Sequence, residues 1–260
     1  MIITLTTDFG LADPFVAIMK GVILGIAPDA QLVDITHDVG AYNVLEAAFI
    51  IDSTYRYFPE GTVHLIVVDP GVGSARRPIA AAGNGHLFVA PDNGVLSCVL
   101  QTDPTASSVY WINNASLFLK SVSQTFHGRD IFAPVAARLA RGIPIESVGP
   151  RIADFVRKAL PKPHLQGDRL VGTVLRVDKF GNIITNLRRH HLGKDFSIRV
   201  AGVSVNRLCS SFSEAEPGEF FAIEGSTGYI ELALNQGSAA DRLNITLGAE
   251  IELETPFVNH

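Results

Sequence analysis

The 260-residue sequence is poor in cysteine, in clustered basic residues and in long apolar runs. Its two cysteines, Cys98 and Cys209, lie far apart without a CxxC pair, which argues against a disulfide scaffold or a zinc–thiolate site and favours a reducing cytoplasmic location. The net charge is −5 and no Lys/Arg cluster occurs, so nucleic acid is not an expected partner. No apolar run approaches the roughly 18 residues that cross a membrane, and no signal peptide is recognisable, so no membrane partner is expected.

What the sequence does contain is an alternation of strand-like and helix-like segments over residues 1–160. The alternating segments, strand first, are 2–8, 14–26, 31–36, 43–58 and 62–69. The last strand is apolar on both faces near its end, as in a buried parallel strand. The pattern predicts an N-terminal α/β domain with a mainly parallel central sheet. Farther along, Gly83-Asn84-Gly85 predicts a hairpin turn, and 128–142 predicts a helix that Pro134 should kink or begin.

The second part of the chain has a different pattern of secondary-structure signals. A polar, proline-bearing stretch at 160–168 reads as a linker. Short strand-like runs with intervening turn residues follow it, and few long helical patterns interrupt them. This spacing predicts a smaller C-terminal β-barrel domain over residues 168–260.

Polar residues follow each of the first three predicted strands. Asp8 ends the first, Thr36-His37-Asp38 ends the second, and Asp69 ends the third. In open parallel sheets, ligands bind beyond the carboxyl ends of the strands. A single aspartate in such a place is usually a cap, but three agreeing strand ends indicate a site.

The stretch VVDPGVGSARRP (67–78) is the most unusual of these strand ends. Gly71 and Gly73 allow a sharp turn and a close backbone approach to a ligand. Asp69 can orient a hydroxyl or a water, and Arg76 can hold an anion or fix that carboxylate. The stretch is neither a P-loop nor a dinucleotide fingerprint, because it lacks GK[ST] and the third glycine.

Three later stretches also carry candidate groups. His127 stands just before a predicted helix in TFHGRDIF (125–132), whereas Asn182, in VDKFGNIITN (177–186), offers an amide that could read the edge of a base. The small residues of EGSTGYIELALNQGSAA (224–240) suit either a pocket lining or a hairpin with a bulge.

Taken together, these motifs resemble the S-adenosyl-L-methionine (SAM) hydroxide adenosyltransferase family, the hydrolytic relatives of fluorinase and chlorinase. The resemblance rests on six motifs that occur in order across nearly the whole chain: TLTTDFG, VVDPGVGSARRPI, APDNG, FHGRDIFAPVAA, DKFGNIITN and GYIELALNQGSAA. It implies an N-terminal α/β domain, a C-terminal β-barrel and a homotrimer whose active sites lie at subunit interfaces. It also implies hydrolysis of SAM to adenosine and L-methionine, with SAM as substrate and no cofactor or metal.

The resemblance also implies roles for individual residues. Asp69, Arg76 and His127 correspond to the Asp-Arg-His set that positions and activates water. For substrate binding, it assigns the two ribose hydroxyls to Asp8, the methionine ammonium to Asp178 and Ser226, and the adenine to Asn182. Thr227 departs from the fluorinase pattern, which has arginine there, and Asp69 departs from the halide-using relatives, which have tyrosine. A carboxylate at that position favours water over a halide ion.

The sequence leaves two other functional hypotheses open. One is a metal-dependent hydrolase that uses Asp8, His37, Asp38 and Asp69 as ligands of a hard metal. The other is a sensor that binds adenosine or SAM and turns it over poorly. The residues also leave open whether Asp69 or His127 is the base that activates water.

Overall fold

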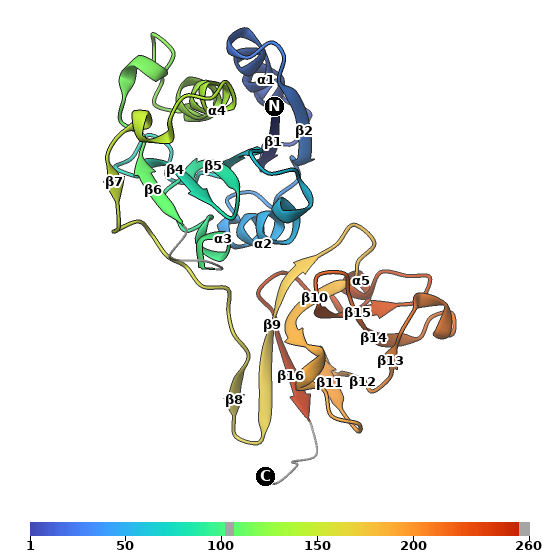
Figure 1. The fold of residues 1–260 in the computed structure, drawn as a ribbon. Helices are drawn as coiled ribbons and strands as arrows, with labels where there is room; N and C mark the ends of the chain where they lie inside the picture. The colour runs from blue at the N-terminus through green and yellow to red at the C-terminus, as the bar shows by residue number, and fades with distance from the viewer. Residues whose placement is uncertain (102–106, 255–260) are drawn as a thin grey trace. The chain divides into compact units, whose positions relative to one another are not determined.

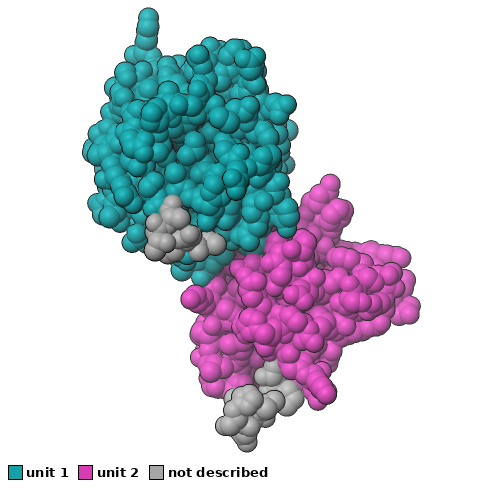
Figure 2. Space-filling model, in the orientation of Figure 1, with its two compact units in different colours: residues 1–160 teal, residues 161–260 magenta. Residues whose placement is uncertain are grey.

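The computed structural model describes residues 1–101 and 107–254. The chain divides into two compact units, unit 1 over Met1–Leu160 and unit 2 over Pro161–His260 (Figure 2). Each has its own sheet and its own apolar core.

Unit 1 is a seven-stranded sheet with helices on both faces (Figure 1). In chain order its strands are β1 (Ile2–Thr7), β2 (Gln31–Thr36), β3 (Val63–Val67), β4 (Pro78–Gly83), β5 (His86–Pro91), β6 (Ser108–Trp111) and β7 (Arg151–Ile152). Their order across the sheet is β2-β1-β3-β5-β4-β6-β7.

The sheet is mixed, which corrects the expectation of a mainly parallel one. The pairs β1–β2, β1–β3 and β3–β5 are parallel, whereas β4–β5, β4–β6 and β6–β7 are antiparallel. The change of direction follows from the hairpin at Asn84-Gly85, where both residues have positive φ (53° and 78°) as a tight two-residue turn requires. The parallel half therefore carries the strand ends at which a ligand is expected.

The helices of unit 1 cover the two faces of the sheet. α1 (Phe15–Ile26) and α4 (Ala133–Ala140) pack on one face, and α2 (Val44–Thr54) and α3 (Ser97–Gln101) lie on the other (Figure 1). A π-helical turn, Gly128–Phe132, leads into α4, and Pro134 lies in the first turn of α4, so the proline marks the start of the α-helical part. Short 3₁₀ turns lie at Tyr55–Tyr57, Ala115–Leu117 and Ile145–Val148. None of the helices described over residues 1–101 and 107–254 has the length and hydropathy of a membrane-spanning segment.

Unit 2 is built on one nine-stranded sheet (Figure 1). Its strands are β8 (His164–Gln166), β9 (Arg169–Val177), β10 (Ile183–Arg188), β11 (Ser197–Val200), β12 (Val203–Val205), β13 (Leu208–Cys209), β14 (Phe220–Glu224), β15 (Tyr229–Leu234) and β16 (Glu250–Glu254). A short helix, α5 (Ala239–Leu243), follows β15, and 3₁₀ turns lie at Arg189–His191 and Phe212–Glu214.

The sheet curls because β9 takes part in both of its halves. The strand order is β12-β11-β16-β9-β10-β15-β14-β13, and β8 also pairs with β9. The first part of β9 pairs with β8 and β16, and its last part pairs with β10. Pairings of the described residues do not join the end strands β12 and β13, so the predicted β-barrel is observed as a curled half-barrel. The segment predicted as a linker contains β8.

Candidate active site

The structure brings together the three residues to which the family resemblance assigns the activation of water. Arg76 donates from Nε to Asp69 Oδ1 at 3.0 Å, and its Nη2 donates to Asp69 Oδ2. The same Nη2 lies 3.1 Å from Nδ1 of His127. The side chains of Asp69 and Arg76 are only 5% and 6% exposed, so this ion pair is largely removed from bulk water.

Local packing explains how segments 51 residues apart meet at this cluster. Gly73 has φ of +76°, and a Cβ on it would lie 2.4 Å from the carbonyl oxygen of Gln124. The turn after β3 therefore presses against the backbone three residues before His127, and only glycine fits there. The sequence predicted that Gly73 allows the backbone to approach a ligand closely, and in the structure Gly73 instead lies close to the protein's own backbone at Gln124.

Buried Asp130 holds the loop that carries His127. It is 0% exposed and accepts a hydrogen bond from Ser123 N at 2.8 Å. Arg129 Nε donates to its other oxygen at 2.6 Å, and Ser123 Oγ accepts from Phe126 N at 3.0 Å. Asp130, the aspartate of the HGRD stretch, therefore stabilises the loop that carries His127.

The motif APDNG fixes the other side of the cluster. Asn93 Nδ2 donates to the carbonyl oxygen of Val68, which directly precedes Asp69, at 2.9 Å. Buried Asp92 accepts from Nε and Nη2 of Arg77 at 3.1 and 2.8 Å. The two consecutive arginines thus differ in role, because Arg76 reaches the cluster while Arg77 ties two loops together.

Hydrogen bonding to Arg76 fixes the proton on His127. A guanidinium can only donate, so Nδ1 of His127 accepts and the ring proton of the neutral imidazole is on Nε2. Burial, and then the charge of Arg76, lower the pKa of His127 below its ordinary value. His127 is therefore a neutral hydrogen-bond donor at neutral pH.

Asp69 has the opposite shift. Burial raises the pKa of Asp69 above its ordinary value, and the charge and hydrogen bonds of Arg76 offset that rise only in part. Arg76 pairs with both oxygens of Asp69 as it would with a carboxylate, and a carboxylate becomes a better proton acceptor as its pKa rises. The arrangement suits Asp69 to accept a proton and His127 to donate a hydrogen bond from Nε2.

Asp8 lies at the end of β1 and is held separately from this cluster. Its Oδ2 accepts from the backbone N–H of Tyr42 at 2.8 Å. The backbone of Tyr42 has φ of +65°, a conformation that non-glycine residues rarely adopt.

In unit 2, the structure brings Asp178 and Asn182 together. Asp178 Oδ1 accepts from the N–H groups of Phe180 and Asn182 at 2.8 and 2.9 Å, and its Oδ2 accepts from Nδ2 of Asn182 at 2.8 Å. The amide of Asn182 is therefore fixed, and its oxygen and second N–H remain for a ligand. Gly181 makes the tight turn possible, since a Cβ there would lie 2.0 Å from Ser238 Oγ.

A pocket of about 510 Å³ lies beside Asn182 and contains residues that sequence reasoning missed. Its lining is Phe180, Asn182, Phe212, Leu234, Gln236 and Gly237. Phe180 and Phe212 are 69% and 47% exposed, which is unusual for phenylalanine. Two exposed aromatic rings beside a fixed amide suit a flat, nitrogen-rich ring. In the sequence, the phenylalanine of the DKFGN motif, Phe180, could have indicated this pocket.

Ser226 lies in a different pocket of unit 2. It is exposed in the turn between β14 and β15 and lines a polar pocket of about 750 Å³ with Arg189, Glu214 and Glu224. The structure thus unites Asp178 with Asn182 and places Ser226 in a second pocket.

The metal-site hypothesis receives no support from the arrangement of its residues. Asp69 is paired with Arg76, and His37 contacts Thr7 and Asp34. Over residues 1–101 and 107–254, no three His, Cys, Asp or Glu side chains converge as metal ligands would.

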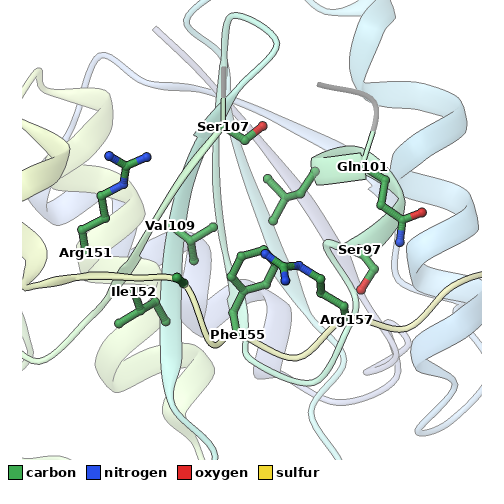
Figure 3. Close-up of a pocket in the computed structure, with 10 residues that line it drawn as sticks. Ser97, Gln101, Ser107, Val109, Arg151, Ile152, Phe155 and Arg157 are labelled. Atoms are coloured by element: carbon green, nitrogen blue, oxygen red, sulfur yellow. The ribbon is translucent and has the colours of Figure 1, made fainter. Parts of the chain in front are cut away.

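Another cavity, of about 770 Å³, lies in unit 1 between α3, β6 and the segment after β7 (Figure 3). Arg151 and Arg157 flank an apolar floor that includes Val109 and Ile152. None of the residues predicted to act on substrate lines it.

Comparison with known proteins gives a consistent result over both units. The profile of the SAM hydroxide adenosyltransferase N-terminal domain matches residues 3–149, and that of the C-terminal domain matches residues 172–252. The chain is 39% identical to an (R)-S-adenosyl-L-methionine hydrolase of Salinispora tropica, covering 96% of this chain and 97% of that protein. It is 32% identical to a fluorinase of Nocardia brasiliensis, covering 97% and 96%.

A solved structure shares the fold. The crystal structure of an uncharacterized conserved protein from Thermotoga maritima superposes with a TM-score of 0.90 at 38% identity, covering 98% of this chain and 100% of that one. Matches to both family domains together span well over half of the sequence. The chain therefore belongs to the SAM hydroxide adenosyltransferase family.

Proposed function

We propose that this protein hydrolyses SAM to adenosine and L-methionine by direct attack of water on the ribose C5′. The observation that carries the proposal is the buried Asp69–Arg76 pair with His127 bound to the same guanidinium. Relatives named as (R)-S-adenosyl-L-methionine hydrolases, 38–40% identical over at least 95% of this chain, support the choice of substrate.

In the proposed mechanism, the attacking water forms one hydrogen bond with Asp69 and one with His127. Water donates one hydrogen to Asp69 and accepts a hydrogen bond from Nε2–H of His127, which leaves its second lone pair for C5′. As the C–O bond forms, the C5′–S bond breaks and its electron pair goes to sulfur, while Asp69 takes the proton. Arg76 keeps both partners in place, and such positioning contributes several kcal/mol to lowering a barrier.

The leaving group explains why a single base is sufficient. Sulfonium leaves as a neutral thioether, so no acid needs to protonate it. The carboxylate of Asp69 repels halide ions but accepts a proton from water, which favours hydrolysis over halogenation. The proposal involves no cofactor and no metal.

The other predicted residues bind the substrate in this proposal. Asp8 accepts hydrogen bonds from the two ribose hydroxyls, and Asn182 reads the adenine edge beside Phe180 and Phe212. The resemblance assigns the methionine ammonium to Asp178 and Ser226, but Ser226 lines a different pocket of unit 2, so this proposal keeps Asp178 alone as the ligand of the ammonium. Asp178 has a second function here, because it fixes the amide of Asn182.

We further propose that residues 1–160 and 168–260 act as two domains and that the protein is a cytoplasmic homotrimer. Catalytic groups lie in unit 1 and adenine-binding groups in unit 2. The family resemblance supports sites formed by unit 1 of one subunit and unit 2 of the next. Among the described residues the two cysteines form no disulfide, which fits the proposed reducing compartment.

Product analysis tests the proposed activity. Purified protein treated with EDTA and incubated with SAM should release adenosine and methionine, and chloride should yield no 5′-chloro product. Loss of activity with EDTA and its return with a divalent ion would favour the metal-dependent alternative. Tight binding of SAM without product would favour the sensor.

Mixing two impaired variants tests the trimer. An Asp69→Asn protein, which lacks the base, and an Asn182→Ala protein, which binds SAM weakly, should gain activity at low SAM concentration when they are denatured and refolded together, if each site combines two subunits. Random assembly would restore about a quarter of the sites. A mixture no more active than its two components assayed separately, or a monomer in light scattering, would contradict the proposal.

A further inference from the structure

His37 is a buried histidine with a hydrogen-bond partner at Nδ1 and a carboxylate beside Nε2. It directly follows β2 and is 4% exposed. Nδ1 lies 2.9 Å from the hydroxyl of Thr7, and Nε2 lies 3.1 Å from Oδ1 of Asp34. The other oxygen of Asp34 accepts from Lys20 Nζ at 2.6 Å.

The partners set the direction of the hydrogen bonds. Burial would raise the pKa of Asp34, but hydrogen bonds from Lys20 and His37 lower it overall, so the carboxylate is ionised. The nitrogen that faces a carboxylate carries the ring proton, which leaves Nδ1 to accept from the Thr7 hydroxyl. The oxygen of Thr7 in turn accepts from the N–H of Phe9 at 3.3 Å.

This chain of contacts ends on the two residues that flank Asp8. The backbone of the His37 segment binds the same turn, since Gly10 N donates to His37 O at 2.8 Å and Val39 N donates to Thr7 O at 3.3 Å. Tyr42, five residues after His37, holds Asp8 Oδ2 through its N–H. The backbone on both sides of Asp8 and the side chain of Asp8 are thus tied to residues 37–42.

We propose that His37 is a positioning residue that aims Asp8 at the ribose hydroxyls, with Asp34 orienting its ring from behind. The inference rests on the proposed function, because it takes Asp8 as the ribose ligand. His37 contacts no substrate in this account. It secures specificity for a ribose that carries both hydroxyls.

A structural role alone would predict a different result, and the chain contains a matched control. His64 is 0% exposed and contacts Thr4 of β1 at 2.8 Å, just as His37 contacts Thr7 of the same strand. The second ring nitrogen of His64 faces buried His86 at 3.3 Å. Loss of either buried histidine should lower stability, but only His37 is joined to the turn of Asp8.

The experiment compares kcat/KM for SAM and for its 2′-deoxy analogue. Wild-type protein should prefer SAM. The substitution His37→Phe should lower kcat/KM for SAM about tenfold and change the analogue much less, because a hydrogen bond to a charged group has weakened. The preference for ribose therefore shrinks about tenfold, whereas His64→Phe leaves it unchanged.

A second pair of variants covers the possibility that His37→Phe does not fold. Thr7→Val removes the hydroxyl without loss of volume, and Thr4→Val is its control on the same strand. Thr7→Val should reduce the ribose preference and Thr4→Val should not. An unchanged preference in folded His37→Phe or Thr7→Val, or an equal loss in the controls, would overturn the inference.

Failure of the proposed function gives a distinguishable outcome. If wild-type protein hydrolyses neither compound, the proposed function is wrong. The inference is then decided by calorimetric affinities for adenosine and 2′-deoxyadenosine, in which the same loss of preference is expected. Equal wild-type affinities for the two nucleosides would overturn it.

Discussion

Replacing Asp69 by asparagine separates the stabilising and the catalytic consequences of the buried ion pair. The amide keeps the shape of the side chain and can still accept from Arg76, but it leaves a guanidinium that is 6% exposed without a counter-charge. Breaking a buried pair in this way costs about 3–5 kcal/mol, and this variant should lie near 3, because the neutral amide keeps a hydrogen bond and avoids the burial cost that raises the pKa of Asp69. The melting temperature of unit 1 should fall by about 6–12 °C.

Catalysis should suffer more than stability. Asparagine cannot take a proton from water, and loss of a general base lowers rates by about 100- to 10,000-fold. The double variant Asp69→Asn/Arg76→Met should regain about half or more of the lost stability, because no unpaired charge remains. It should stay inactive.

Chromatography of released adenosine and a thermal unfolding curve measure both effects. Asp154→Asn is the control, since Asp154 pairs with neighbouring Arg77 at 3.0 Å but its side chain is 79% exposed. It should leave rate and melting temperature unchanged. An Asp69→Asn protein with kcat within about threefold of wild type, or a double variant no more stable than the single one, would refute the reasoning.

Three further predictions concern pH, adenine recognition and metal. Because the pKa of Asp69 is raised, kcat/KM should rise with pH through a midpoint above the ordinary carboxyl value of 3.8. This rise should persist in the His127→Gln variant. A flat pH profile in that variant would assign the base to His127 instead. Asn182→Ala should raise KM for SAM about tenfold or more and abolish discrimination against the inosine analogue, whereas unchanged discrimination in steady-state assays would remove Asn182 from the adenine site. Overnight dialysis against EDTA should leave kcat within error of the untreated protein, and a loss restored by Mg²⁺ or Zn²⁺ would show the opposite.

The pH dependence of stability has a definite sign for the same carboxyl group. Because the pKa of Asp69 is higher in the folded state than in the unfolded state, the folded state binds the proton more tightly. This group therefore favours folding below its unfolded pKa and loses that contribution as pH rises through the folded pKa. As pH rises and Asp69 ionises, the rate of hydrolysis should increase while the contribution of Asp69 to folding stability decreases.

Local sequence signals were sufficient for much of the N-terminal fold. Apolar periodicity located β1, α1, β2 and β3, and the turn at Asn84-Gly85 identified the β4–β5 hairpin. The mixed character of the sheet was missed because strand direction beyond the hairpin depends on long-range pairing of β4 with β6. In unit 2, β12 and β13 have only three and two residues, too few for a period to be recognised.

The candidate site shows the same division between local and long-range information. Asp69, Arg76 and His127 could be named from motifs, and the structure brings them together. The choice between two bases could not be made from sequence, because it depends on which ring nitrogen of His127 faces Arg76. Phe212 lies 30 residues from Asn182 in the chain, so only the fold places it in the same pocket.

The most direct test of the central claim is hydrolysis of SAM in oxygen-18 water, followed by mass analysis of both products. Attack of water on C5′ predicts one labelled oxygen in the 5′-hydroxyl of adenosine and none in methionine, with labelled adenosine formed at least about 100-fold more slowly by Asp69→Asn. Unlabelled adenosine, or label in homoserine beside methylthioadenosine, would show that water does not displace methionine at C5′ and would contradict the account.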